Sequence, residues 1–297
     1  NVSSSQRKPC FIGKASPYKK VTHESVVRGN TGLSDRLAYT SAGIYEIIEV
    51  GSQRGLNNFI EGTHFNLSNN EIVWTSTGWV VAGATYFVTY QYVRPDEDYK
   101  YKEFYNYEDV VDDLGDDIPD NPLVMISKLA LKYYNVPAIG IVQVPSAGTT
   151  SDYGNALDLI KYRDVQTVCC LTTSAAVRAL LISHVQERSL PDNGRYRIGW
   201  TGAAAGTVIG DESDPTSLRG MAAAIRKERI VFPQATRAQY SYNDPTTKQE
   251  LTTTVDGSFL AAAIAAYRDS YAHPTTTLLN KTIPGLTLFA DDYDDYY

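Results

Sequence analysis

The spacing of hydrophobic residues divides the chain near residue 99. Before it, from about residue 21 to 98, short runs of β-branched and aromatic residues alternate with Gly- and Asn-rich turns, which is typical of antiparallel strands. In TYFVTYQY (residues 85–92), Tyr86, Val88, Tyr90 and Tyr92 fall on one face of the predicted strand. Further strands are predicted at residues 44–50 and 71–75. This part therefore predicts a small antiparallel β sandwich or barrel.

After residue 99, helical and strand patterns alternate. Val177, Leu180, Leu181, His184 and Val185 recur at i, i+3, i+4, i+7 and i+8, which indicates one apolar helix face. Similar helices are predicted over residues 123–133, 153–160, 214–225 and 258–271, strands at 138–144, 167–171, 196–200 and 229–232, and a hairpin about 243–245. Asp214-Pro215 is expected to begin the fourth helix. The alternation predicts an α/β domain with a mostly parallel or mixed sheet and helices on its faces.

The predicted fold class is therefore multidomain, α+β or α/β. Residues 1–20, broken by Ser, Pro and Gly, are predicted to be an N-terminal arm. They are followed by a β-rich domain (21–98), which ends in a linker near residues 94–98, and by an α/β core domain (99–290). Residues 291–297 alternate acidic and aromatic side chains and are interpreted as a solvated tail at a truncation point.

Composition narrows the class of protein. The 297 residues are 43% hydrophobic and 21% charged, as in ordinary globular proteins. The net charge of −7 argues weakly against a nucleic-acid partner, because phosphate contacts need Lys and Arg. No apolar run approaches the ~20 residues of a membrane span. The three cysteines (Cys10, Cys169 and Cys170) form no CxxC pair, which fits a reducing compartment, and Cys169 and Cys170 are interpreted as small core residues of a strand.

One Gly-rich segment is a candidate for catalytic or cofactor-binding chemistry. GWTGAAAG (residues 199–206) follows a predicted strand but lacks both the GK[ST] ending of a phosphate loop and the GxGxxG spacing of a dinucleotide site. A close-packed loop is the preferred interpretation. His184 lies on an apolar helix face, and no two histidines have i, i+4 spacing for a metal. We therefore expect no catalytic residue, metal or cofactor.

Charged residues cluster at two places in the chain, and tyrosine is unusually frequent. Carboxylates gather between residues 109 and 117, and Arg226, Lys227 and Arg229 form a compact basic patch. The acidic residues are interpreted first as solvated turns, and the basic ones as a cap on a helix C-terminus. The chain has 22 Tyr against 8 Phe, and tyrosine is favoured at interfaces. This composition favours an assembly protein.

Several segments, in order, resemble the tail sheath proteins of contractile-tailed bacteriophages. ESVVRG (24–29), FIEGTHFNL (59–67), NEIVW (70–74) and GATYFVTYQY (83–92) are similar to the family's inserted β domain. YEDVVDDLG (107–115), LTT (171–173), SLP (189–191), RKERIVFP (226–233) and LNKTIPG (279–285) resemble its α/β part. The resemblance covers roughly residues 24–289, and the order and spacing of the segments carry it.

The resemblance implies a structural subunit that polymerises around a tail tube and contracts, driving the tube through the host envelope for genome ejection. Contraction would release stored free energy by rigid-body rearrangement of subunits. The implied partners are copies of the chain, the tube protein, the baseplate and the tail terminator, with no membrane, nucleic acid or cofactor. The implied location is the virion tail, and the host cytoplasm during assembly. Sheath proteins continue into a further domain, so this chain is expected to be a core fragment whose own polymerisation stays an open question.

The residues proposed for subunit contacts carry opposite charges: Asp112, Asp113, Asp116, Asp117, Arg226, Lys227 and Arg229. Two alternative functions stay open. One is another phage tail or baseplate adaptor module that shares the β domain. The other is a phosphate- or nucleotide-handling α/β enzyme centred on residues 199–206.

Overall fold

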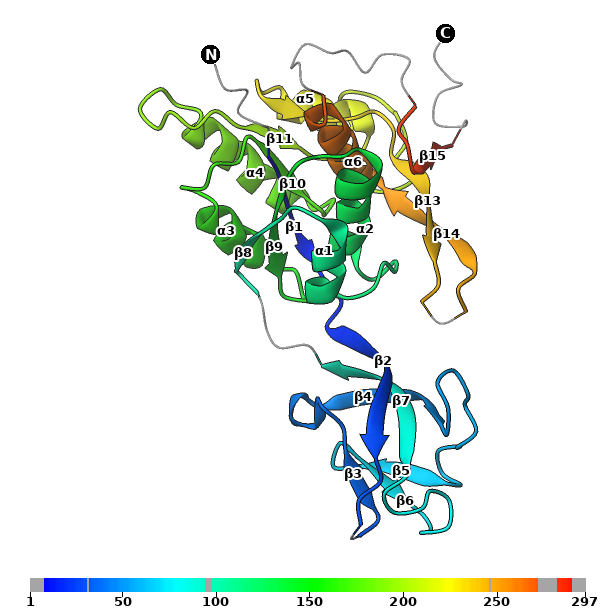
Figure 1. Ribbon diagram of the computed structural model, residues 1–297. Coiled ribbons are helices and arrows are strands. Elements are labelled where there is room, and N and C mark those ends of the chain that lie inside the picture. The colour runs from blue at the N-terminus through cyan, green and yellow to red at the C-terminus, as the bar shows by residue number, and fades with distance from the viewer. Residues whose placement is uncertain (1–7, 31, 94–97, 246, 272–281, 290–297) are drawn as a thin grey trace. The chain divides into compact units, whose positions relative to one another are not determined.

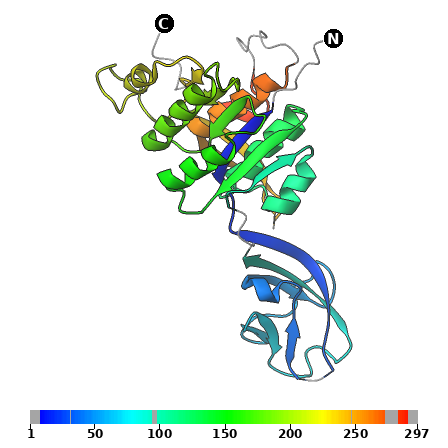
Figure 2. The same cartoon turned by 90° about the vertical axis from the view of Figure 1, so that its left-hand side faces the viewer.

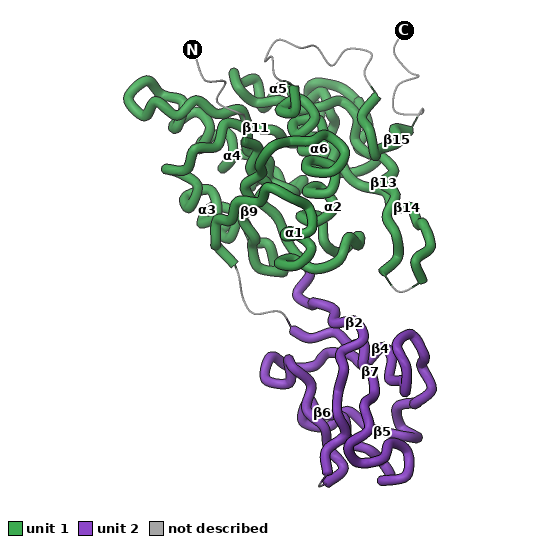
Figure 3. Tube along the Cα trace, in the orientation of Figure 1, with its two compact units in different colours: residues 1–15, 97–297 green, residues 16–96 purple. Residues whose placement is uncertain are grey.

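The computed structural model describes residues 8–30, 32–93, 98–245, 247–271 and 282–289. The chain forms two compact units (Figure 3): the β unit, Ser16–Asp96, and the α/β unit, which comprises Asn1–Ala15 and Glu97–Tyr297. Antiparallel sheets, a mixed sheet and covering helices together make a multidomain α+β fold, so the predicted fold class is confirmed. Most of the predicted linker and all of the predicted tail at 291–297 lie outside the described residues.

The α/β unit is built on a six-stranded sheet with the order β12-β11-β10-β1-β9-β8 (Figure 1). Neighbouring strands are parallel except for β8, which runs antiparallel to β9. The strands are β1 (Pro9–Lys14), β8 (Tyr101–Phe104), β9 (Ile139–Val144), β10 (Thr167–Cys170), β11 (Ile198–Trp200) and β12 (Ile230–Val231). A second, three-stranded antiparallel sheet contains β13 (Arg237–Asn243), β14 (Glu250–Asp256) and β15 (Leu286–Leu288). The pairing of β13 with β14 confirms the predicted hairpin.

Strand β1 overturns the predicted N-terminal arm. Residues 1–20 were expected to be irregular because of their Pro and Gly, but Pro9–Lys14 pairs with β10 on one side and β9 on the other. Pro9 is tolerated because it is the first residue of the strand. A Cβ on Gly13 would lie 3.0 Å from Leu171 Cδ1, so the glycine permits close packing. The arm prediction is wrong because these breakers stand inside a central strand.

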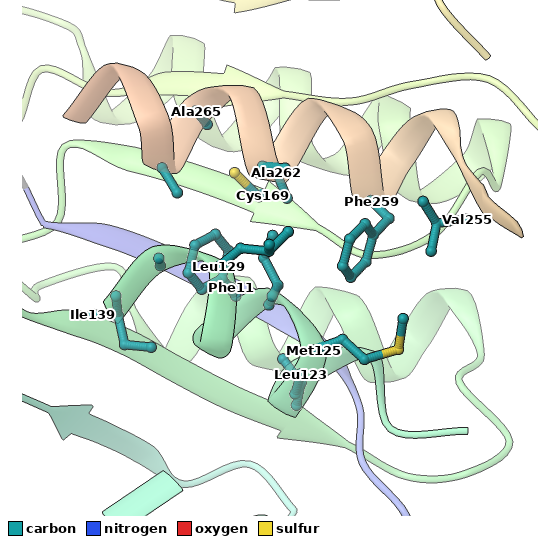
Figure 4. Close-up of a cluster of buried hydrophobic side chains, with 14 of the residues drawn as sticks. Phe11, Leu123, Met125, Leu129, Ile139, Cys169, Val255, Phe259, Ala262 and Ala265 are labelled. Carbon is teal, nitrogen blue, oxygen red and sulfur yellow. The ribbon is translucent and has the colours of Figure 1, made fainter. Parts of the chain in front are cut away.

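Helices cover both faces of this sheet, as Figures 1 and 2 show. They are α1 (Tyr107–Leu114), α2 (Pro122–Ser127), the π-helical turn η2 (Lys128–Tyr133), α3 (Thr150–Leu159), α4 (Ala175–Arg188), α5 (Leu218–Ile225) and α6 (Gly257–Asp269). One core lies with α1, α2, η2 and α6 and contains Phe11 and Cys169 (Figure 4). The opposite core lies with α3 and α4 and contains Cys10, Ile12 and Cys170. Successive strand residues thus alternate between two apolar layers. Cys169 and Cys170 are core residues as predicted, and Cys10 is buried as well.

The start of helix α5 differs from its prediction. The helix begins at Leu218, and Ser217 caps it by accepting a hydrogen bond from the Gly220 amide. The Asp214 carboxylate instead accepts from the amide and hydroxyl of Thr216, at 2.8 and 2.7 Å. Asp214 therefore closes a local turn, in which a short polar side chain competes with helix initiation.

The β unit contains two antiparallel three-stranded sheets, ordered β2-β7-β4 and β3-β6-β5. Its elements are β2 (Tyr18–Val27), β3 (Ser34–Arg36), the 3-10 turn η1 (Thr40–Ala42), β4 (Ile44–Gly51), β5 (Phe65–Ser68), β6 (Glu71–Trp74) and β7 (Thr85–Val93). Tyr86, Val88, Tyr90 and Tyr92 all join its buried core, which confirms the face predicted from the alternation.

A buried carboxylate ties the core of the β unit together. Asp35 accepts hydrogen bonds from Arg28 Nη1 at 3.1 Å, the Gly29 amide at 2.8 Å, Trp74 Nε1 at 2.8 Å and the Tyr86 hydroxyl at 2.9 Å. Burial raises the pKa of Tyr86, which keeps its hydroxyl a donor. A buried charge is tolerated when it is paired and hydrogen-bonded, as Asp35 is. Through these hydrogen bonds the carboxylate joins three strands and the loop before β3.

Candidate interaction surfaces

In parallel sheets, ligands bind beyond the carboxyl ends of the strands, so this edge is the first place to look for a site. A hollow of about 290 Å³ lies there, after β10 and beside the start of α6. It is lined by Pro119, Pro122, Met125, Leu171, Ala205, Thr253, Thr254, Val255, Asp256, Ser258 and Phe259. Asp256 is the one titratable side chain in this lining.

The Gly-rich segment at this edge packs backbone against backbone. A Cβ on Gly202 would lie 2.0 Å from the carbonyl oxygen of Gly257, and a Cβ on Gly257 would lie 2.6 Å from that of Ala203. The Gly257 amide also donates to the Ala203 carbonyl at 2.9 Å. The glycines therefore let the chain after β11 touch the first residue of α6. This agrees with the interpretation of residues 199–206 as a close-packed loop.

The start of α6 is already occupied by a carboxylate. Asp256 Oδ1 accepts from the Ser258 amide at 2.9 Å, the Ser258 hydroxyl at 2.6 Å and the Phe259 amide at 3.0 Å. A bound phosphate would need these same amides and would meet the negative charge of Asp256. The arrangement does not fit a phosphate-handling site.

His184 is buried on α4 as predicted, and its partner is Arg197. Its Nε2 contacts Arg197 Nη1, and burial, reinforced by the nearby cations, lowers the pKa of His184 to about 3. Arg197 is fully buried, and its Nη2 donates to the carbonyls of Ile160, Lys161 and Arg163 at 2.7, 3.2 and 3.1 Å. These carbonyls follow α3, where cations are favoured. The pair thus fixes the end of a helix.

His23 and His64 have structural partners that the sequence did not indicate. His23 Nε2 lies 3.6 Å from Glu49 Oε1. His64 Nδ1 accepts from the Ile60 amide at 2.9 Å, and its ring packs edge-on against Trp79 at 4.4 Å. His273 lies outside the described residues. Across the described chain, His, Cys, Asp and Glu form no group of three suited to a metal ion.

The acidic cluster lies on and after α1, and two of its carboxylates are held within the chain. Lys102 Nζ donates to both oxygens of Asp113, at 2.7 and 2.8 Å. Asp117 accepts from Lys128 Nζ at 2.5 Å and from the Tyr240 hydroxyl at 2.7 Å.

The outer face of this cluster is open to solvent. Asp112 is exposed, as are Glu108 and Asp109, and Asp116 is half-buried. The prediction that Asp112, Asp113, Asp116 and Asp117 form a subunit contact stays a prediction.

The basic patch lines a hollow of about 320 Å³ with Gln186, Ser189 and Glu228. Arg226 pairs with Glu212 and the Arg229 guanidinium lies 5.0 Å from the ring centre of Tyr196, whereas Lys227 is exposed. Arg226 is the residue that ends α5, but its side chain turns to Glu212 instead of the helix carbonyls. The assignment of Arg226, Lys227 and Arg229 to a subunit contact likewise stays a prediction.

Comparisons with known proteins match one family model and several solved structures. A family model described as "Domain of unknown function (DUF4815)" matches residues 7–103, fewer than half of the chain, and runs from β1 through the β unit into β8. A comparison with curated proteins finds no match. Among the described helices, none has the length and apolar character needed to cross a membrane.

The solved structures that match include two sheath proteins. One is the helical sheath of the anti-feeding prophage in its contracted state, with a TM-score of 0.39 and 8% identity over 90% of this chain and 50% of that one. The other is the sheath tail protein of Desulfitobacterium hafniense, with a TM-score of 0.32 and 8% identity over 91% of this chain and 60% of that one. The chain therefore spans about half the length of these proteins. TM-scores this low do not establish a shared fold.

Proposed function

We propose that the chain is a structural subunit of a contractile sheath. Copies of the full-length protein assemble as a helical cylinder around a tail tube, and contraction drives the tube through a host envelope. Each subunit moves as a rigid body between two packings, and many small differences in contact free energy add along the cylinder. The proposed partners are the tube protein, the baseplate and the tail terminator. The proposed location is the virion tail.

The observation that supports a structural role is the contact between Gly202 and Gly257 at the carboxyl edge of the sheet. There, an α/β enzyme would place its ligand between strand ends and helix amides. In this chain the two backbones touch, and Asp256 binds the amides of α6. The same observation disfavours the phosphate- or nucleotide-handling alternative. The sheath assignment itself rests on the order of the sequence segments that resemble that family.

Negative-stain electron microscopy of the full-length protein, expressed alone, tests self-assembly. Hollow tubes of uniform width are expected. Monodisperse particles at every salt and protein concentration would instead favour the baseplate adaptor. Thermal shift with ATP, GTP, NAD and inorganic phosphate tests the enzyme alternative separately. We expect no change in the midpoint, and a rise with one nucleotide that an Asp256→Ala variant alters would count against the structural role.

A further inference from the structure

We propose that the acidic surface of α1 in one copy docks onto the basic surface beside β12 in the next copy, head to tail. The acidic surface is defined as Glu108, Asp109 and Asp112. The basic surface is defined as Arg163, Arg195, Arg226, Lys227 and Arg229. This inference rests on the proposed function, because it names the surfaces by which copies associate.

The acidic surface stands out because carboxylates are dense in the sequence around it. Between Glu103 and Ser127 there are seven carboxylates and no Lys or Arg. Lys102 and Lys128 each pair with one of these carboxylates from outside that segment. Glu108, Asp109 and Asp112 lie on the exposed side of α1, whose buried side carries Val110 and Leu114. The helix therefore presents a convex, negatively charged side to solvent.

The basic surface is formed by two adjoining hollows. Five cations and two carboxylates line them, the carboxylates being Asp164 and Glu228. The hollow that contains Arg163 and Arg195 has a volume of about 410 Å³. Arg229 stacks on Tyr196 and joins that hollow to its neighbour. A concave surface with excess positive charge is complementary to a convex helix with negative charge.

Helix α1 and the Arg229 end of the basic surface lie at opposite edges of the same sheet, whereas Arg163 reaches back to β8, where its guanidinium lies 5.0 Å from the ring centre of Tyr101. Helix α1 follows β8 and contacts it, whereas Arg229 directly precedes β12, and β8 and β12 are the two edge strands. Five strand spacings separate these edges, or roughly 24 Å at the usual distance between strands. This exceeds the screening length of ~8 Å at physiological ionic strength. The part of the basic surface beside β12, Arg226, Lys227 and Arg229, therefore attracts the acidic surface of another copy and not that of its own.

Different surfaces on opposite edges make a heterologous contact. Such a contact leaves one acidic and one basic surface unused at the ends, so it continues into a chain or helix of copies instead of stopping at a dimer. Each surface also carries an exposed aromatic side chain. Tyr105 is 67% exposed beside α1, and Tyr196 is 56% exposed between the two hollows. Tyrosine next to opposite charge is typical of protein interfaces.

Two edge variants of the full-length protein test the pairing. The acidic-edge variant carries Glu108→Lys and Asp112→Lys, and the basic-edge variant carries Arg195→Glu and Lys227→Glu. A control with Asp158→Lys and Glu46→Lys reverses two exposed carboxylates elsewhere and changes net charge as the acidic-edge variant does. Circular dichroism and thermal unfolding check that each variant is folded. Sedimentation velocity and electron microscopy then report assembly.

We expect wild type and control to polymerise, and each edge variant alone to remain monomeric. Mixed together, the edge variants offer one intact acidic surface to one intact basic surface, and one reversed surface of each kind to the other. The mixture is therefore expected to associate again, and the association should weaken by about tenfold or more between 50 and 500 mM NaCl. Polymers from either edge variant would overturn the inference and leave the sheath function standing. If neither edge variant polymerises and their mixture shows no association, the proposed pairing of the two surfaces would be overturned. A wild-type protein that never polymerises would count against the sheath function itself.

Discussion

Replacing Gly202 with alanine should destabilise the α/β unit more than its small size suggests. The added Cβ would lie 2.0 Å from the Gly257 carbonyl oxygen and 2.6 Å from the Ser258 amide nitrogen. Ordinary van der Waals contact begins near 3.4 Å. Both obstacles are backbone atoms, so no side-chain rotation relieves the clash, and α6 has to move away from the chain after β11.

The size of the effect follows from what that movement breaks. Overpacking in a dense core costs about 1–3 kcal/mol. The hydrogen bond from the Gly257 amide to Ala203, now 2.9 Å, contributes about 1 kcal/mol. Distorting the Asp256 cap costs about 1 kcal/mol more. The expected loss is therefore about 3–5 kcal/mol, a large part of the ~5–15 kcal/mol that stabilises a typical protein.

Urea unfolding followed by circular dichroism at 222 nm measures this loss. The signal reports on the α/β unit, because every described α-helix lies there. Gly154→Ala is the matched control. Its Cβ would meet Leu180 Cδ1 at an ordinary 3.6 Å inside α3, so we expect a gain of roughly 0.5–1 kcal/mol.

A Gly202→Ala protein that loses less than about 1 kcal/mol, the scale of a single ordinary hydrogen bond, would refute this reasoning. It would mean that the chain after β11 and the start of α6 separate readily. The carboxyl edge would then be open to a ligand, and the main support for a structural role would be removed.

Three further predictions follow from buried groups. Asp35→Asn removes the charge that pairs with Arg28 and should cost the β unit about 3–5 kcal/mol, measured by Trp fluorescence during unfolding; an unchanged midpoint would contradict the role of Asp35. The pKa of His184 is about 3 in the folded protein and near 6.5 in the unfolded chain. The contribution of neutral His184 to the free energy of unfolding is therefore full above pH 6.5. It is lost as the pH falls from 6.5 toward 3, by up to about 1.4 kcal/mol per pH unit, because the unfolded chain binds the proton first. His184→Gln should therefore give a flatter stability curve between pH 6.5 and 4, and parallel curves would refute the assignment. Burial raises the pKa of all three cysteine thiols, so a thiol reagent should label none of them before urea unfolds the protein.

The alternation of apolar and polar residues predicted the β unit well, because its strands have one buried face and one face that is more exposed to solvent. Tyr86, Val88 and Tyr90 are fully buried, as the alternation required. The same rule failed for β1. A central parallel strand is buried on both faces, so PCFIGK shows no alternation, and Pro9 and Gly13 have the composition of a loop.

The surfaces were harder to predict because their geometry depends on residues distant in sequence. The basic patch and the acidic cluster are visible as runs of like charge. Nothing local indicates that Lys102 and Lys128 neutralise part of that cluster, or that Gly202 meets Gly257. The partnership of His184 with Arg197 is likewise a product of how α4 packs beside β11.

The proposed function is that the full-length protein assembles into a sheath around a tail tube. Co-expression of the full-length protein with its tube protein, followed by cryo-electron microscopy, tests it most directly. We expect tubes coated by a regular helical outer layer of this protein. Bare tubes beside monodisperse particles of this protein, at low and physiological salt alike, would contradict it.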